Sequence, residues 1–326
     1  MADALGSGPS EGNVIGVQVP FWADSIRLYS TMNPFFSAQN KTQTSEKKVI
    51  LTGASGLIGR EAVKPLEEAG FKVYALDSKN TDLFDYDAVD SFLKKINAQY
   101  LLHFAWITDG DYLENPVNLK YKEASLNLLS SFKKYGGKRA VMAGTCFEYA
   151  FKNSLLKETD LIKPKSLYAE CKTELFNRSL EYCRKNNLSL GWGRIFYVFG
   201  NNENPKRLTG TLINSFKANK KVIINTGELI RDYMYAKDIA AAFVKLLESN
   251  AEGAVNICTG KGVTLKEFAQ TFARILKKEN LLEIRNDKTS QPPFIAGDNT
   301  RLKKEAGYSP RYTLEEAVWE IVREVP

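Results

Sequence analysis

Short apolar runs alternate with longer amphipathic stretches along the chain from residue 47 onward. The apolar runs are bounded by polar or turn-forming residues and predict buried strands over Lys48–Thr52, Phe71–Leu76, Tyr100–Phe104, Arg139–Ala143 and Leu188–Trp192. The stretches between them repeat apolar residues at helical spacing and predict helices over Leu57–Ala69, Tyr86–Lys95, Val117–Tyr135 and Ser166–Lys185. Strands that alternate with helices in this way predict an α/β fold with a doubly wound parallel sheet.

The pattern is less regular after Gly200. It predicts helices over Lys206–Ala218, Ala236–Ser249, Thr264–Lys278 and Thr313–Glu324, and strands over Lys221–Asn225 and Gly253–Ile257. The last two helices open with a threonine that is followed three residues later by a glutamate, which is the spacing of a capping box. We expect residues 236–257 to return to the main sheet and the other elements to form a smaller, mostly C-terminal lobe.

Residues 1–46 differ from the rest, because Gly, Ser, Asn and Pro are frequent and the periodicity is weak. We predict an N-terminal arm or tag for this segment. Apolar side chains such as Phe21, Trp22 and Tyr29 are costly to leave in water, so an arm that docks on a surface is the alternative.

The composition is that of a folded globular protein, since 44% of the 326 residues are hydrophobic and 25% are charged. The formal net charge is +7, but the lysines are scattered and no basic stripe alternates with aromatic residues, which argues against nucleic-acid binding. A mildly basic surface instead suits a doubly anionic small substrate. No apolar run approaches the roughly 18 to 20 residues that a membrane span needs.

The four cysteines have no CxxC spacing and His103 is the only histidine, so we expect no metal site. Free thiols fit a reducing compartment, and the N-terminus lacks the basic-then-apolar order of a secretory signal. Both observations predict a cytoplasmic protein.

A glycine-rich turn, Val49-Ile-Leu-Thr-Gly53-Ala-Ser-Gly56-Leu-Ile-Gly59, follows the first strand and opens the first helix. Glycines let the backbone approach a pyrophosphate, which then lies at a helix N-terminus that favours an anion. Asp77 ends the second strand 18 residues after Gly59, where a carboxylate takes both ribose hydroxyls and repels a 2′-phosphate. We therefore expect a Rossmann-type domain over 47–196, also receiving about 233–257, that binds NAD. The expected turn contacts are Gly53, Ser55, Gly56, Leu57, Ile58 and Gly59.

NADP is the alternative cofactor, because Arg60, Ser78 and Lys79 lie near the expected position of the ribose.

Tyr168 and Lys172 are four residues apart on a predicted helix and share one face. There the ammonium is expected to lower the phenol's pKa and to hold the nicotinamide ribose, and the phenol to exchange a proton with a substrate hydroxyl or ketone. Thr145, at the end of the preceding strand, would hydrogen-bond the reacting oxygen. This combination predicts a sugar or alcohol oxidoreductase.

With these motifs in this order, the chain from about Lys47 to Tyr312 resembles the extended short-chain dehydrogenase/reductase family. The similar branch is that of NAD-dependent sugar-nucleotide epimerases, dehydratases and 4-reductases. The further segments that carry the resemblance are Asp82-Leu83, His103-Phe-Ala-Trp106, Arg231-Asp-Tyr-Met-Tyr235 with Asp238, and Gly307-Tyr-Ser-Pro310.

The resemblance implies that Asp82 and Leu83 meet the adenine and that Phe104, Ala105 and Trp106 line the cofactor, which His103 only borders. Around a nucleotide-sugar substrate it implies Thr145, Cys146, Tyr197, Arg207 and Arg231, with Arg231 on the diphosphate. It further implies a substrate lobe made of 197–232 and 258–326, and a homodimer formed by the helices at 117–135 and 166–185.

Departures from the family pattern narrow the expected reaction. Members that dehydrate sugars carry Asp and Glu directly after the threonine, and here those places hold Cys146 and Phe147. Epimerisation at C3 or C5 needs a second acid/base pair, commonly Cys with His, and the chain has no second histidine.

We therefore expect reduction of a 4-keto-6-deoxy sugar nucleotide in surface-glycan or deoxysugar biosynthesis. Tyr197 stands where epimerases usually hold an Asn, and only four residues separate Asp77 from Asp82; both features favour reduction. The alternatives are an NAD-dependent 4-epimerase and a catalytically inactive cofactor-binding protein.

Overall fold

The computed structural model describes residues 46–77, 81–201 and 203–324. The expected N-terminal arm, apart from Glu46, lies outside the described residues. Six parallel strands form the main sheet in the order β10-β5-β4-β3-β1-β2. The strands are β1 (Lys47–Thr52), β2 (Phe71–Leu76), β3 (Tyr100–His103), β4 (Arg139–Thr145), β5 (Ser189–Ile195) and β10 (Gly253–Ile257). The α/β fold with a parallel central sheet is thus confirmed.

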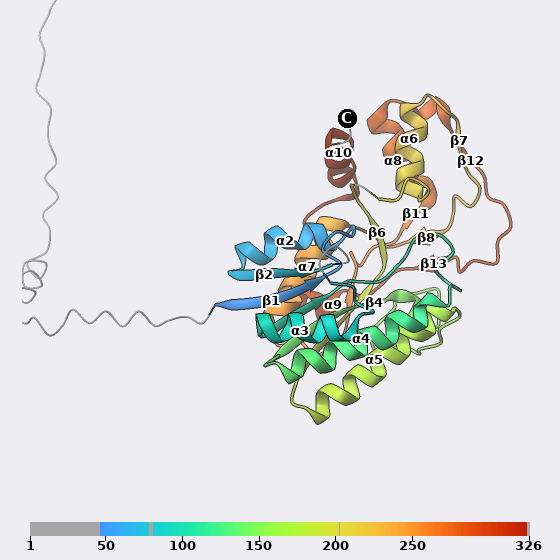
Figure 1. Ribbon diagram of the computed structural model, residues 1–326. Coiled ribbons are helices and arrows are strands. Elements are labelled where there is room, and N and C mark those ends of the chain that lie inside the picture. Colours follow the sequence, from blue (N-terminus) through green and yellow to red (C-terminus); the bar gives the residue numbers. More distant parts are fainter. Residues whose placement is uncertain (1–45, 78–80, 202, 325–326) are drawn as a thin grey trace, which may run out of the picture. The chain divides into compact units, whose positions relative to one another are not determined.

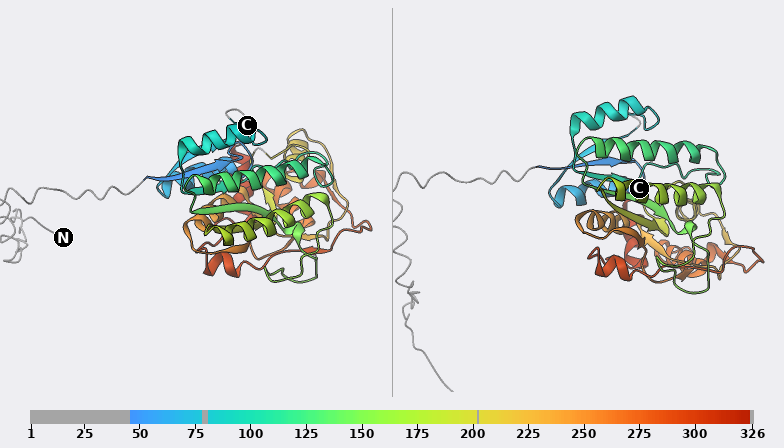
Figure 2. Two further views of the ribbon diagram at one scale, coloured as in Figure 1. Left: turned by 60° about the horizontal axis from the view of Figure 1, so that its bottom comes forward. Right: turned by 90° about the horizontal axis from the view of Figure 1, so that it is seen from below.

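Helices cover both faces of this sheet (Figures 1 and 2). One face carries α3 (Tyr86–Ile96), α4 (Val117–Lys134) and α5 (Leu167–Lys185), and the other carries α2 (Gly59–Glu68) and α7 (Ala236–Glu248). Successive residues of β1 pack on opposite faces of the sheet. Val49 packs with α2 and α7, and Ile50 packs with α3, α4 and α5. Burial on both faces explains why the strands are continuous apolar runs in the sequence.

The direction in which strands are added reverses beside β1. The chain moves outward from β1 to β2, returns to β3 on the other side of β1, and continues outward through β4, β5 and β10. The carboxyl ends of β1 and β3 therefore flank a crevice, the place where open α/β sheets bind ligands.

A second core lies around α6 (Leu208–Lys217), α8 (Leu265–Leu276) and α10 (Leu314–Glu324). Short strands pair outside the main sheet: β6 (Tyr197–Phe199) with β9 (Tyr233–Tyr235), β7 (Val222–Ile224) with β12 (Leu282–Ile284), and β8 (Ile230–Arg231) with both β11 (Val263–Thr264) and β13 (Phe294–Ile295). The remaining elements are α9 (Thr300–Lys304) and the 3₁₀ turns η1 (Cys146–Glu148) and η2 (Glu279–Leu281). We keep 197–232 and 258–326 as the proposed substrate lobe.

The two capping boxes predicted from the sequence are present in the second core. Thr264 and Glu267 form a reciprocal capping box on α8, and Thr313 and Glu316 make the same pair of bonds at the start of α10. Every helix in the described part of the chain is too short or too polar to cross a lipid bilayer.

Candidate active site

The glycine-rich turn after β1 is closely packed against its neighbours. Gly53 has φ +70°, and a Cβ added there would lie 2.8 Å from the backbone nitrogen of Ala105. A Cβ on Gly59 would lie 2.1 Å from the carbonyl oxygen of Gly53. The helix that follows has no side-chain cap, and the amides of Arg60 and Glu61 in its first turn donate to the carbonyl oxygens of Gly56 and Ile58. A bare backbone surface at the start of a helix fits the pyrophosphate of a dinucleotide.

A cleft of about 1100 Å³ opens at this edge of the sheet. Its wall contains these expected site residues: Gly53, Ser55, Gly56, Leu57, Ile58, Gly59, Asp77, Asp82, Leu83, Phe104, Ala105, Trp106, Thr145, Tyr168, Lys172, Tyr197 and Arg207. Two expected substrate contacts, Cys146 and Arg231, do not line it.

The β2 side of the cleft holds Asp77 together with Arg60. The Arg60 guanidinium donates to the carbonyl oxygens of Gly56 (3.1 Å) and Ser55 (2.8 Å), so it is folded back onto the glycine turn. A cation therefore stands beside the turn on the same wall as the carboxylate that is expected to select NAD.

The expected catalytic side chains lie together, and all three are buried. Tyr168 is on the first turn of α5, which Ser166 caps by accepting from the amide of Ala169. Its phenol is hydrogen-bonded to Thr145 at the end of β4. The Lys172 ammonium donates to the carbonyl oxygen of Ala143 at 2.8 Å. Strand β4 therefore holds both the hydroxyl partner of the tyrosine and the anchor of the lysine.

The pKa values of this group differ from those that the sequence led us to expect. Burial raises the pKa of the Tyr168 phenol, and the hydrogen bond to Thr145 offsets this only in part. Burial also lowers the pKa of Lys172 to about 7, so this side chain is only partly charged at neutral pH. The Lys172 ammonium donates to Ala143, and the lowering of the phenol's pKa by Lys172 stays a prediction.

Aromatic rings surround the catalytic pair. Lys172 Nζ lies 3.8 Å from the centroid of the Trp106 ring system. The Tyr168 ring is met edge-on by Trp106 at 6.2 Å and by Tyr112 at 5.1 Å. The expected bordering residue His103 is buried between Thr52 and Ser125, at 2.7 and 2.8 Å, away from the cleft wall.

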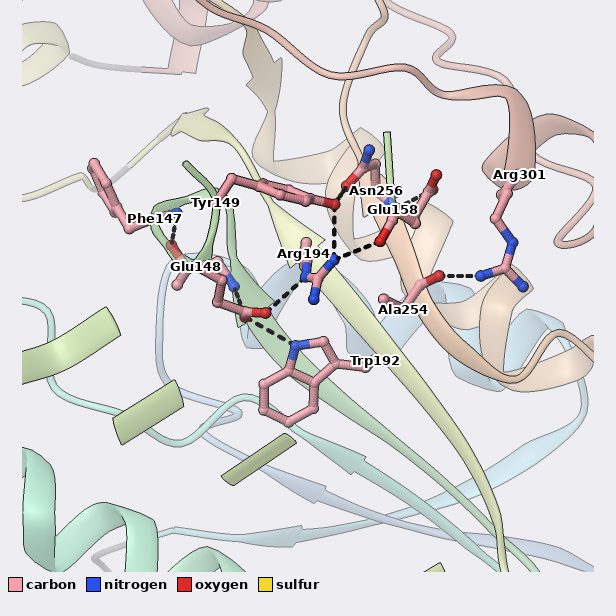
Figure 3. A network of polar contacts seen from close by, with 10 residues as sticks. Phe147, Glu148, Tyr149, Glu158, Trp192, Arg194, Ala254, Asn256 and Arg301 are labelled. Atoms are coloured by element: carbon pink, nitrogen blue, oxygen red, sulfur yellow. Dashed lines mark hydrogen bonds and ion pairs between the residues drawn. The ribbon is translucent and has the colours of Figure 1, made fainter. Parts of the chain in front are cut away.

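The buried ion pair of Glu148 and Arg194 (Figure 3) supports Thr145. Glu148 is completely buried; its Oε1 accepts from the Thr145 amide (2.9 Å) and from Trp192 Nε1 (2.9 Å). Its Oε2 accepts from Arg194 Nε at 2.7 Å. Thr145 and Glu148 also form a capping box on η1. The sequence contains this Thr-x-x-Glu spacing, so a search for capping boxes would have found Glu148, which our sequence reading missed.

The network continues beyond Arg194 to the segment between η1 and α5 and to β10. Arg194 Nη1 donates to the Tyr149 hydroxyl (2.9 Å), which donates to Asn256 Oδ1 (2.7 Å). The Asn256 backbone amide donates to Glu158 Oε1 at 2.8 Å. Figure 3 shows these side chains meeting between β4, β5 and β10.

The lobe side of the cleft is aromatic and basic. Phe147, Tyr197 and Tyr233 line it, with Tyr197 6.2 Å from Phe147 and 5.5 Å from Tyr233. Arg207 lies at the start of α6 and donates to the carbonyl oxygen of Thr108 at 2.5 Å. Glu203 also lines this wall; burial raises its pKa to about 7. No sequence motif marked Glu203. Tyr233 lies within the segment Arg231–Tyr235 but was not expected to line the site.

Two expected substrate contacts, Arg231 and Cys146, do not line the cleft wall. Arg231 donates to the carbonyl oxygens of Ile230 and Pro292, at 2.8 and 2.9 Å, and to Gln291 Oε1. Cys146 is buried, and burial raises the pKa of its thiol far above the ordinary value. The Arg231 guanidinium also lies 5.5 Å from the centroid of the Tyr197 ring, which lines the wall. Contacts of Arg231 and Cys146 with a substrate remain predictions.

Residues 49–258, more than half of the chain, match the NAD-dependent epimerase/dehydratase family. The chain belongs to this family. The family resemblance read from the motifs is confirmed, and so is NAD as the expected cofactor.

Three known proteins illustrate the relationship. The dTDP-6-deoxy-L-talose 4-dehydrogenase (NAD(+)) of Aggregatibacter actinomycetemcomitans is 27% identical over 69% of this chain and 88% of its own length. The GDP-6-deoxy-D-talose 4-dehydrogenase of the same organism is 26% identical over 84% of this chain and 96% of its own. The structure of UDP-glucose 4-epimerase with UDP-glucose from Thermotoga maritima has 22% identity and a TM-score of 0.77, covering 85% of this chain and 97% of that one. The last similarity shows the shared fold.

Replacing Glu148 by Gln should destabilise the protein, because it leaves the buried Arg194 cation without its counter-charge. We expect the free energy of unfolding to fall by about 3 kcal/mol in urea denaturation. The matched control is Glu68→Gln, which removes an exposed ion pair with Lys64 and should change little. A Glu148→Gln protein as stable as the control would show that the buried pair is not a structural support.

Replacing Asp77 by Ala should weaken NADH binding about tenfold or more, since it removes the carboxylate that is expected to accept from both ribose hydroxyls. The difference between the NADH and NADPH dissociation constants, measured by cofactor fluorescence, should narrow. The control is Asp87→Ala, an exposed aspartate on α3 outside the cleft wall. A wild-type protein that already prefers NADPH would assign the selectivity to Arg60 instead.

Proposed function

We propose that this protein reduces a 4-keto-6-deoxy sugar nucleotide with NADH. The observation that carries the proposal is the cluster of Thr145, Tyr168 and Lys172 on the wall of a cleft that also contains the glycine turn. Reduction at C4 needs a hydride, which the bound nicotinamide supplies, and one proton donor, which Tyr168 can be. The intact cluster also argues against a catalytically inactive cofactor-binding protein.

The burial of the other ionisable groups near Thr145 supports reduction over dehydration. Both oxygens of Glu148 accept hydrogen bonds, and its side chain is completely buried behind the cleft wall. Cys146 is buried with a raised thiol pKa. Neither residue can serve as a second acid or base at the substrate without rearrangement. The names of two relatives, both 4-dehydrogenases of 6-deoxytalose nucleotides, support redox chemistry at C4.

The diphosphate of the substrate is proposed to bind at the start of α6. This helix has no side-chain cap, so its first amides are available, and Lys206, Arg207, Leu208 and Thr209 line the cleft there. Arg207 presents a guanidinium that matches a phosphate in geometry and charge. It replaces Arg231 as the principal anion contact in our proposal, because Arg231 is bonded away from the cleft wall.

Cofactor stoichiometry separates the reductase from a 4-epimerase. A reductase should consume one NADH for each 4-keto-6-deoxy sugar nucleotide, observed as loss of NADH absorbance. Tyr168→Phe should slow turnover by about 10²- to 10⁴-fold and leave NADH affinity nearly unchanged, because only the proton donor is removed. Interconversion of two C4-epimers without net NADH consumption would replace the reductase proposal by the epimerase.

We also propose a homodimer formed through α4 and α5. Both helices carry apolar residues that are not fully covered, and a hollow between them is lined by Leu126, Leu129, Arg178, Glu181, Tyr182 and Lys185. Light scattering at micromolar concentration should give twice the chain mass of 36.6 kDa. Leu126→Glu should shift the mass toward one chain, whereas Leu161→Glu, at a site 70% exposed and outside both helices, should not. A wild-type mass of one chain would refute the dimer.

A further inference from the structure

The Lys172 ammonium is buried, which makes its charge energetically costly. It is 3% exposed, and within the described residues its ammonium has one hydrogen-bond acceptor, the Ala143 carbonyl oxygen, although an ammonium has three donors. A buried cation with so few partners tends to lose its proton. The ammonium also lies over the ring system of Trp106, with Nζ 3.8 Å from the ring centroid.

The Trp106 ring is itself firmly held. Its Nε1 donates to Asn118 Oδ1 at 2.7 Å, and Asn118 in turn donates to the carbonyl oxygens of Tyr112 (2.7 Å) and Asn115 (2.8 Å). The indole also stacks on Tyr121 at 5.4 Å. An indole fixed at its edge and on one face cannot turn away from the ammonium that lies over the ring.

We propose that Trp106 is a positioning residue that keeps the Lys172 ammonium charged and in place for the cofactor. The negative face of an indole favours the charged form of a cation above it, most strongly where water is excluded. The Ala143 carbonyl oxygen accepts a hydrogen bond from one N–H group of the ammonium, and the Trp106 ring covers one side of it. The remaining N–H groups are left to donate to the ribose of the cofactor. The inference rests on the proposed function, because it gives Trp106 a role through the same lysine.

The other groups around the ammonium do not provide this effect by themselves. Glu148 on η1 and Cys171 on the same helix favour the charged form, yet burial still lowers the pKa of Lys172 to about 7. Tyr168 on the first turn of α5 is uncharged, since burial raises the pKa of its phenol. His103 on β3 has a pKa of about 3 and is neutral. Near pH 7 a modest change in the surroundings therefore alters the charge of Lys172 appreciably.

The test is a pH titration of lysine ε-carbon and ε-proton resonances in full-length ¹³C-lysine-labelled protein, with the Lys172 signal assigned by its absence in Lys172→Met. In the wild type, the ring current of the indole should shift the Lys172 ε-protons upfield. Trp106→Leu should abolish that shift and lower the pKa of Lys172 by about one unit, since the charged form loses a favourable interaction. Trp106→Phe keeps a ring and should retain part of both effects.

The control is Trp319→Leu, which removes a half-exposed tryptophan on α10 and should leave the Lys172 titration unchanged. The inference is overturned if the wild-type ε-protons show no upfield shift, or if Phe and Leu at position 106 lower the pKa equally. The titration needs neither substrate nor turnover. Its outcome is therefore independent of whether the enzyme proves to be a reductase or an epimerase.

Discussion

The ion pair between Glu148 and Arg194 is the interaction on which the candidate site depends most. Two opposite charges that are almost completely removed from water must satisfy each other, because either one alone would cost several kcal/mol to bury. Glu148 uses its remaining bonding capacity on the Thr145 amide and on Trp192. The hydroxyl that is expected to touch the substrate is therefore fixed by charges that never reach the cleft.

A different kind of support acts from the opposite side. Trp106, tied to Asn118 and stacked on Tyr121, faces Lys172 and the edge of Tyr168. The catalytic group is thus bounded by a charged network on the β4–β5 side and by aromatic packing on the β3 side. The first arrangement fixes positions through directional bonds. The second excludes water and leaves the ionisation of the lysine and tyrosine sensitive to what enters the cleft.

The sequence predicted those parts of the molecule that depend on local pattern. The main strands, the helices around them and the turn Gly53–Gly59 follow from periodicity and from steric requirements that glycine alone meets. The two-residue strands, such as β8 and β13, could not be predicted, because they display no alternation and exist only through pairing with distant partners. The same holds for the ionisation state of Lys172, which depends on burial that no local pattern encodes. Arg231 matched a motif, yet its bonds to Pro292 and Gln291 come from a loop far along the chain.

The network behind Thr145 also constrains when the site can form during synthesis. Its members are far apart in the chain: Glu148 and Arg194 are separated by 46 residues, and Tyr149 and Asn256 by 107. The polypeptide carrying Thr145, Tyr168 and Lys172 leaves the ribosome well before the strand that completes their support. Contacts of such long sequence separation form late, because the intervening chain must first be ordered. A nascent or truncated chain that ends before β10 would therefore contain every motif of the catalytic group without its native framework.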